Sequence, residues 1–477
     1  MITAQMFWAR AVVAGDMVGP DAPAREFYRM LEAYYLNNGL YDSTQQMLYE
    51  NGIWTPGMKA LRNPAKRTVE FHVTHIWPGS LDKALQVVTL NDRIRAPIKQ
   101  VWKWSNWGVK KQLAARWFAL FGDWFCKVAT STDASGKVNR VFLQNIKPEL
   151  VTDFEEDERG NVISIRLDIP YQPPKDGFTL PSARTYTEIW TREEYRLYIH
   201  VREPGAPVST LGDPVRVTAL SEFGIDFVPF VHSSFMDLGD KRGTGVFTLA
   251  LDKIDEANRM TTRLHQMIFR YNKPTVAILA NGTDAAGRPL PPPKVAGSVN
   301  DLANEKDEDV KSFPGTSKME YLVPPLNYAA HLDIINAQMR ELEEDLPELS
   351  YYRQKELGSS ISGKAVRLLL SQAVDRTLEA RGNLELGLVR ADKMALTMGV
   401  NAGIFKRIGI YERGDFEHEF AEREVIPFTV QESADTLATE VTAGVPLALA
   451  AKRRGWNQSD IEELRITTEN KTAEAVK

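Results

Sequence analysis

The chain has 477 residues, of which 43% are hydrophobic and 25% charged, a composition typical of globular proteins with roughly two to four packed units. Its formal net charge of −5 excludes a protein that grips nucleic acid over its whole surface, although a local basic patch remains compatible. No stretch reaches the roughly 18 apolar residues of a membrane helix, and the single cysteine, Cys126, excludes an intrachain disulfide or a thiolate metal cluster. The N-terminus lacks the basic segment of a secretory signal, so we expect synthesis in a reducing cytoplasm.

The N-terminal part is predicted to be a tail followed by aromatic helices. Residues 1–24 show no periodicity and are expected to be flexible. Helices are predicted over Arg25–Leu36, Asp92–Trp104 and Val109–Phe125. A stacking platform for bases is the alternative use of their rings, but the helical spacing favours a hydrophobic core. These rings belong to Trp102, Trp104, Trp107, Trp117, Phe118, Phe121, Trp124 and Phe125.

From Lys127 the hydrophobic period changes to two, and turn signals separate the segments. This pattern predicts a mainly antiparallel β unit. The predicted strands are Val138–Gln144, Asn161–Ile169, Arg184–Thr191, Tyr195–Val201, Pro214–Ala219 and Asp226–Val231.

Two long helices with apolar residues at alternating spacings of four and three follow, over Val246–Asn272 and 326–349. Such a seam suits helices packed side by side at a small angle, and at about 1.5 Å per residue the first would reach roughly 40 Å. The helices are therefore predicted to form a projecting stalk that contacts neighbouring subunits. The seam residues are Ala250, Ile254, Ala257, Thr261, Leu264, Ile268 and Tyr271 in the first helix, and Tyr328, Leu332, Ile335, Met339, Leu342, Leu346 and Leu349 in the second.

The segment between these helices is predicted to carry short strands, Thr275–Ala280 and Lys318–Val323. A third and longer helix starts at residue 365. Beyond it, Asp415–Val430 is predicted to be extended, with short helices over Ala434–Ala443 and Val445–Arg454 and a polar helix from Gln458 onwards.

No enzyme motif is complete in this sequence. Gly358–Ala365 approaches a phosphate-binding P-loop, but Ala365 occupies the position where Ser or Thr would hold magnesium, and no buried strand precedes it. His72 and His75 lie in a segment that alternates like a strand, on opposite faces, and they and His418 are interpreted as surface histidines. We therefore expect no catalytic residues, no metal and no cofactor.

The Gly/Ser-rich loop combines rings, cations and small residues at the end of a rigid scaffold. Such a loop suits transient contact with a polyanion, and a disordered connector is the equally weighted alternative. Its residues are Tyr351, Tyr352, Arg353, Gln354, Lys355, Gly358, Ser359, Ser360, Ser362 and Lys364.

Four motifs in this order resemble the portal proteins of tailed bacteriophages. Residues 32–39 (EAYYLNNG) resemble the opening of that family, and 145–151 (NIKPELV) resemble its wing. Phe227–Val231 with 243–258 resembles the start of the stem, and 358–370 resembles the tunnel loop with the helix behind it. Together they span about residues 25–467.

The resemblance implies an α+β fold of portal type, with an α/β wing, a two-helix stem, a small α/β clip, a long wing helix and a helical crown. The implied boundaries are a tail at 1–24, wing at 25–240, stem helix 1 at 241–272, clip at 273–325, stem helix 2 at 326–349, tunnel loop at 350–364, long helix and following turn at 365–414, and crown at 415–477.

The same resemblance implies a ring of about twelve identical subunits at one capsid vertex, in a virion assembled in the bacterial cytoplasm. Double-stranded DNA would pass through it without sequence specificity. The implied partners are the large terminase, a head-completion or adaptor protein, and the major capsid and scaffolding proteins, with no membrane.

The second stalk helix is acidic, and Glu341, Glu344, Asp345 and Glu348 are candidates for a channel lining that repels phosphate. Two alternatives stay open. One is a structural adaptor or scaffold that oligomerises without conducting DNA. The other is a DNA-processing enzyme that binds nucleotide at 358–364.

Overall fold

The computed structural model describes residues 22–37, 62–171, 184–201, 204–271, 275–279, 318–322, 328–352, 368–426 and 430–453. The chain separates into two compact units. The rod unit contains residues 42–63 and 252–345, and the body unit contains 2–41, 64–251 and 346–477. Helices and strands occur in both units, so the protein has a mixed α+β fold.

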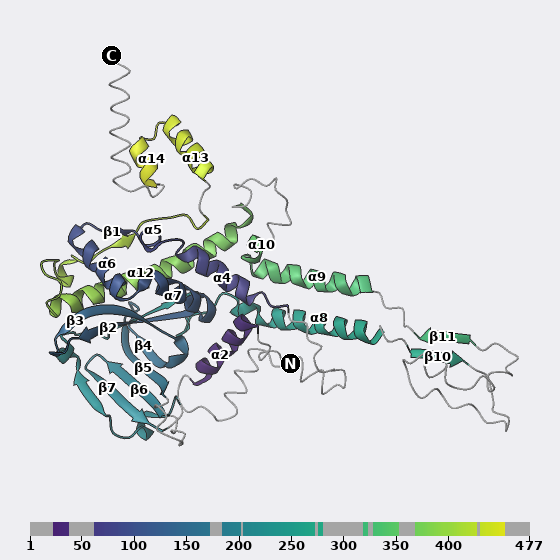
Figure 1. Ribbon diagram of the computed structural model, residues 1–477, viewed down its shortest axis with the longest axis horizontal. Coiled ribbons are helices and arrows are strands. Elements are labelled where there is room, and N and C mark those ends of the chain that lie inside the picture. The colour runs from purple at the N-terminus through teal and green to yellow at the C-terminus, as the bar shows by residue number, and fades with distance from the viewer. Residues whose placement is uncertain are drawn as a thin grey trace, which may run out of the picture. The chain divides into compact units, whose positions relative to one another are not determined.

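The centre of the body unit is a three-stranded antiparallel sheet of order β3-β2-β9, packed against helices α6, α7 and α12 (Figure 1). These elements are β2 (Asp123–Thr132), β3 (Val138–Ile146), β9 (Phe230–Ser234), α6 (Arg95–Trp104), α7 (Trp107–Phe121) and α12 (Ser371–Asn401).

A second sheet has five antiparallel strands in the order β4-β5-β6-β7-β8. The predicted antiparallel β unit is thus confirmed, although β9 begins at Phe230 rather than at Asp226. The strands are β4 (Val151–Glu156), β5 (Val162–Tyr171), β6 (Arg184–Thr191), β7 (Glu194–His200) and β8 (Arg216–Ala219).

Shorter elements complete the body unit, including an antiparallel pair, β1 with β12, that joins distant parts of the chain. The two short helices predicted over Ala434–Ala443 and Val445–Arg454 occur close to those positions, while the polar helix predicted from Gln458 onwards lies outside the described residues. The elements are α2 (Ala22–Leu36), α4 (Ala65–Ile76), α5 (Leu81–Ala84), β1 (Val87–Val88), α10 (Leu349–Tyr352), β12 (Glu419–Phe420), α13 (Val430–Thr442) and α14 (Leu447–Arg453), with short 3-10 turns at 92–94, 148–150, 208–210, 220–223, 248–250 and 411–413.

The aromatic residues of the N-terminal helices form the core predicted for them. Trp102, Trp107, Phe118 and Phe121 are almost fully buried, and Trp104 and Trp117 are half-buried. One boundary was wrong, because Trp124 and Phe125 belong to strand β2 and not to a helix. Gly122 ends α7 in the left-handed region at φ 85°, where glycine carries no Cβ penalty.

His72 and His75 lie on helix α4, so the predicted strand was wrong. The alternation of Phe71, His72, Val73 and Thr74 imitates period two, but the buried side chains of the helix recur at spacings of three and four. Both histidines are buried, as is His418 on the segment before β12, which corrects their interpretation as surface residues.

Helix α12 continues without interruption through Gly382 and Gly387 and contacts all three strands of the central sheet. A Cβ atom at Gly387 would lie 2.1 Å from Ser233 Oγ and 3.1 Å from Trp124 Cζ3. Gly387 therefore permits close packing of the helix on the sheet.

The rod unit consists of helix α8 (Leu251–Tyr271), the antiparallel strands β10 (Thr275–Leu279) and β11 (Lys318–Leu322), and helix α9 (Tyr328–Asp345). Both helices are shorter than predicted. Residues 246–250 precede α8 as a loop and a 3-10 turn, and Pro347 separates α9 from α10, because proline cannot continue a helix.

Candidate functional site

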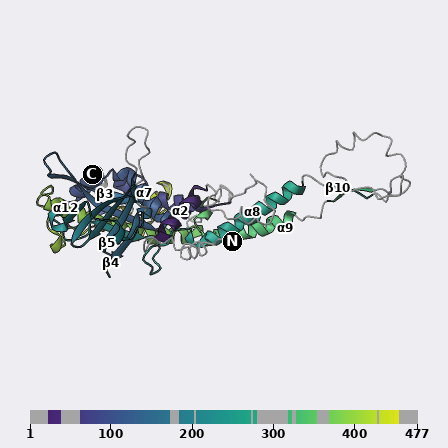
Figure 2. The same ribbon diagram turned by 90° about the horizontal axis from the view of Figure 1, so that it is seen from below.

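Helices α8 and α9 lie side by side and antiparallel (Figure 2). Lys253 near the start of α8 pairs with two carboxylates near the end of α9, at 2.9 Å from Glu341 Oε1 and 2.7 Å from Asp345 Oδ2. These groups are largely solvent-exposed, so each pair contributes less than about 1 kcal/mol. These ion pairs favour the antiparallel direction of the two helices but contribute little to the stability of the fold.

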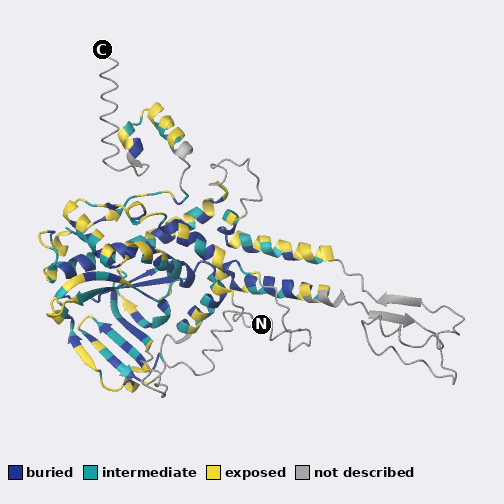
Figure 3. Ribbon diagram, viewed as in Figure 1, coloured by how far each residue is buried: buried dark blue, intermediate teal, exposed yellow. Residues whose placement is uncertain are grey.

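Part of the predicted apolar seam is covered within one chain, and part is not (Figure 3). In α8 the residues Ile254, Ala257 and Leu264 are buried, as is Ala250 in the turn before it. On α9, the seam residue Leu332 is 44% exposed, and Ile334, which lies outside the predicted seam, is 53% exposed. The remaining seam residues are Thr261, Ile335, Leu342, Leu346 and Leu349, which are buried, Met339, which is half-buried, Ile268 and Tyr328, which are exposed, and Tyr271, whose side chain is not described.

The proposed acidic lining divides into exposed and buried residues. Glu341, Glu344 and Asp345 are exposed at the end of α9. Glu348 is fully buried in the body unit, so its assignment to a solvent-filled channel wall was wrong. Its carboxylate is enclosed because it has two cationic or hydrogen-bonding partners inside the protein.

Glu348 is the centre of a buried joint formed with His72 and Arg376. Glu348 Oε1 lies 2.9 Å from His72 Nε2 and 3.0 Å from Arg376 Nη1. Burial raises the pKa of Glu348, but the hydrogen bond from His72 and the charge of Arg376 outweigh burial and hold the pKa below its usual range. Arg376 Nη2 also donates to Val246 O at 3.0 Å. One guanidinium thereby holds both the segment that leads into α8 and the segment that follows α9.

A close glycine contact secures the same segment ahead of α8. Gly243 packs against Gly122, where a Cβ on Gly243 would come 2.2 Å from Gly122 O. Backbone hydrogen bonds flank the contact, from Val246 N–H to Ala119 O at 2.9 Å and from Phe235 N–H to Gly122 O at 2.7 Å. No side chain fits between these backbones.

His232, on strand β9 of the central sheet, contacts two carboxylates, Asp123 on β2 of the same sheet and Glu156 on β4 of the second sheet. Its imidazole Nε2 donates to Asp123 Oδ1 at 2.7 Å, and Nδ1 donates to Glu156 Oε1 at 3.3 Å. Asp123 also accepts hydrogen bonds from Tyr28 Oη and from the Gly243 N–H, the latter at 2.8 Å. Burial lowers the pKa of His232, but the hydrogen bonds to both carboxylates outweigh it and raise the pKa to about 9. The residue is therefore an imidazolium at neutral pH.

Of the predicted loop residues, the structure describes Tyr351 and Tyr352, which lie in helix α10. The Tyr351 ring packs edge-on against Phe71 at 5.5 Å, and Tyr352 Oη donates to Arg67 O at 2.9 Å. Both contacts fix the chain to helix α4. The other predicted loop residues, from Arg353 to Lys364, lie outside the described residues, and so does the proposed nucleotide loop.

Within the described ranges, no group of three or more His, Cys, Asp or Glu side chains is arranged to hold a metal ion. Burial raises the pKa of the Cys126 thiol, which leaves this side chain a poor nucleophile. Separately, none of the described helices has the length and apolarity to cross a bilayer.

Sequence reasoning missed the buried joint. His72 and Glu348 are 276 positions apart, and neither belongs to a motif. A carboxylate next to Pro347 and between Leu346 and Leu349 was the available signal, because an acidic residue surrounded by apolar ones at a helix end is often buried with a partner.

No family model and no curated protein matches this sequence. Among solved structures, the chain is similar to one described as "Neck of native GTA particle computed with C12 symmetry". The two share 12% identity at a TM-score of 0.44, and the match covers 87% of this chain and 99% of the other. At this TM-score the likeness does not identify a family.

Proposed function

We propose that this protein is the portal protein of a tailed phage or related particle. It forms a closed ring of about twelve copies at one capsid vertex, through which double-stranded DNA enters during packaging and leaves during ejection. The ring also presents docking surfaces for the large terminase, a head-completion protein and the surrounding capsid and scaffolding proteins. In this proposal its role is structural and not enzymatic.

The observation that carries the proposal is the incompletely covered α8–α9 pair. Ile254, Ala257 and Leu342 are buried, but Leu332 and Ile334 on α9 are exposed to solvent. Apolar side chains left exposed on a helix are favourable when a further subunit covers them. The order of sequence motifs along residues 25–467 supports the same assignment independently of this geometry.

Charge supports the conduit role over that of a passive adaptor. Glu341, Glu344 and Asp345 are exposed together, with Lys253 as the paired cation. Repeated around a ring, such carboxylates would give a negatively charged surface. That surface repels phosphate and lets DNA slide, because it forms no neutralising contacts that would have to be broken.

The buried joint supports a mechanical role for the body unit. Arg376 ties Val246 to Glu348, so the two chain segments that bound the rod unit are held by one side chain. In the proposed ring, this joint would hold together the two chain segments between which residues 252–345 are inserted.

Electron microscopy of the purified full chain tests the proposal. We expect class averages with rotational symmetry and a central opening wide enough for a DNA duplex. A ring with a filled axis would favour the oligomeric adaptor that does not conduct DNA. Particles of single chains at high concentration would contradict both.

A further inference from the structure

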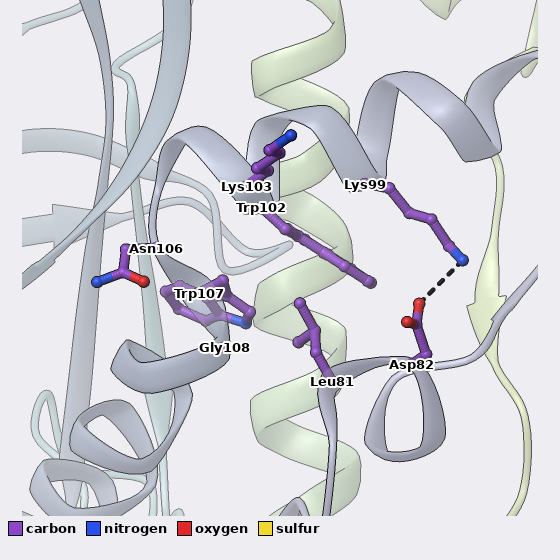
Figure 4. A pocket seen from close by; sticks show the side chains of 8 residues that line it. All are labelled: Leu81, Asp82, Lys99, Trp102, Lys103, Asn106, Trp107 and Gly108. Atoms are coloured by element: carbon purple, nitrogen blue, oxygen red, sulfur yellow. Dashed lines mark ion pairs between the residues drawn. The ribbon is translucent and has the colours of Figure 1, made fainter.

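A pocket of about 380 Å³ opens on the body unit between helix α6, the first turn of α7 and the start of α5 (Figure 4). It belongs neither to the helix pair nor to the buried joint. Its lining residues are Leu81, Asp82, Lys99, Trp102, Lys103, Asn106, Trp107 and Gly108.

Helix α7 directs its N-terminus at this pocket. Asn106 precedes the helix in the left-handed region, at φ 53°, and its side chain makes no capping hydrogen bond. The N–H groups of Val109 and Lys110 donate to Asn106 O, so those of Trp107 and Gly108 come before the first bonds of the helix. The start of a helix carries a partial positive charge that favours anions.

The indole of Trp107 supplies an independent donor. Trp107 is fully buried, yet its Nε1 has no hydrogen-bond acceptor among the described residues. The ring is held between Trp77 and Trp124, with centroids 6.2 Å away on both sides. Figure 4 shows its nitrogen-bearing edge turned towards Leu81, across the pocket. A buried donor left unpaired costs about 1–3 kcal/mol, so an acceptor placed there is favourable.

Cations lie at the rim of the pocket. Lys103 is exposed and has no carboxylate within 4.0 Å among the described side chains. Lys99 Nζ lies 2.9 Å from Asp82 Oδ1, and both side chains are mostly exposed. The carboxylate of Asp82 repels an anion, so a bound anion is most favourable at the end of the pocket formed by Trp107 and Lys103.

We propose that this pocket binds the oxyanion group of a small solute, a carboxylate or a phosphate. The oxyanion accepts hydrogen bonds from Trp107 Nε1 and from the first backbone N–H groups of α7, and Lys103 neutralises its charge. Each protein group supplies a donor or a positive charge, which is the complement that such an anion requires.

Isothermal titration of the full-length protein tests the site, with inorganic phosphate in one arm and glutarate in the other. We expect saturable binding of one ion per chain in at least one arm. Trp107→Phe removes the donor and leaves a smaller aromatic ring, so it should weaken binding roughly tenfold and lower the melting temperature through the cavity that it creates. Lys103→Gln should weaken binding several-fold, whereas Lys137→Gln, an exposed lysine on the β2–β3 turn, is the matched control and should have no effect.

Gly108→Leu provides a variant that closes the pocket. A Cβ at Gly108 meets no atom within 4 Å, and Gly108 has no positive φ, so the variant should fold and lose binding. Binding in the phosphate arm alone identifies a phosphate ligand, and binding in the glutarate arm alone identifies a carboxylate. Absence of saturable binding in both arms overturns the proposal. If Trp107→Phe and Gly108→Leu both bind the ion as tightly as the unaltered protein does, the proposal is also overturned, because that result means an adventitious ion only.

Discussion

Glutamate side chains have opposite environments at the end of helix α9 and in the buried joint that follows it. Glu341 and Glu344 remain in solvent, whereas Glu348 is fully enclosed and paired with His72 and Arg376. A buried carboxylate is retained when its partners replace the water that it has lost, so Glu348 has a structural role. The exposed carboxylates contribute little to folding and are therefore available to interact with partners or to repel them.

The largest expected effect is at the joint. Glu348→Ala leaves His72 and Arg376 without their shared carboxylate inside the protein, and we expect a loss of about 3–5 kcal/mol in the free energy of unfolding. Urea unfolding followed by the fluorescence of the buried tryptophans measures it. The matched control is Glu344→Ala, which should change the free energy by less than about 0.5 kcal/mol. Equal effects of the two substitutions would contradict the distinction between these regions.

The second expected effect is a dependence on pH from His232. Its pKa is raised by folding from an ordinary value near 6.5 to about 9, so the stabilisation is complete below pH 6.5 and is lost as pH rises through 9. The stabilisation from His232 is at most about 4 kcal/mol, because the pKa rises from 6.5 to about 9 and each pKa unit corresponds to roughly 1.4 kcal/mol.

Unfolding of the protein and of His232→Gln, measured at a series of pH values between 6 and 9.5, isolates this contribution. The free energy of unfolding should fall more steeply with pH for the protein than for the variant. Parallel curves would show that the imidazolium does not stabilise the fold.

A smaller effect is expected where helix α12 crosses the central sheet. Gly387→Ala places a Cβ against Ser233 Oγ, and we expect a loss of about 1–3 kcal/mol from overpacking. Gly382 lies on the same helix in open space, so Gly382→Ala should raise stability by about 0.5–1 kcal/mol. The opposite signs of the two changes are the measurable result, and a stabilising Gly387→Ala would exclude the close packing.

The smallest expected effect is in the rod unit. Lys253→Gln removes both ion pairs with α9, and because these groups are exposed we expect a change below about 1 kcal/mol. Repeating the unfolding measurement at high salt should abolish the difference between the protein and the variant. A loss as large as that of Glu348→Ala would place these pairs in the same class as the buried joint.

Local patterns in the sequence were sufficient to locate most elements. Period two identified β3, β5, β6, β7, β8 and the start of β9 but not β2 or β4, and turn residues such as 158–161 marked where strands end. Apolar spacing of three and four identified α8 and α9. The errors arose where the local pattern was ambiguous, as in α4, or where one residue decided the outcome, as Pro347 and Gly122 did.

The buried polar groups could not be predicted in the same way. The contacts of Glu348 with His72 and of Asp123 with His232 join residues that are far apart in the sequence. Such pairs depend on tertiary packing, which sets burial and geometry together, and hydrophobic periodicity treats their residues as ordinary polar positions. For the same reason, Glu341, Glu344, Asp345 and Glu348 were all interpreted as exposed, although Glu348 is buried.

Native mass spectrometry of the purified chain tests the central claim, that further copies cover the apolar side chains left exposed on the helix pair. We expect a single closed species whose mass is a whole multiple of 53.7 kDa. A Leu332→Glu, Ile334→Glu double variant should dissociate into monomers with an intact body unit, whereas Ala337→Glu serves as a charge control on the same helix. A protein that remains monomeric at high concentration, or a double variant that assembles as the protein does, would contradict the account.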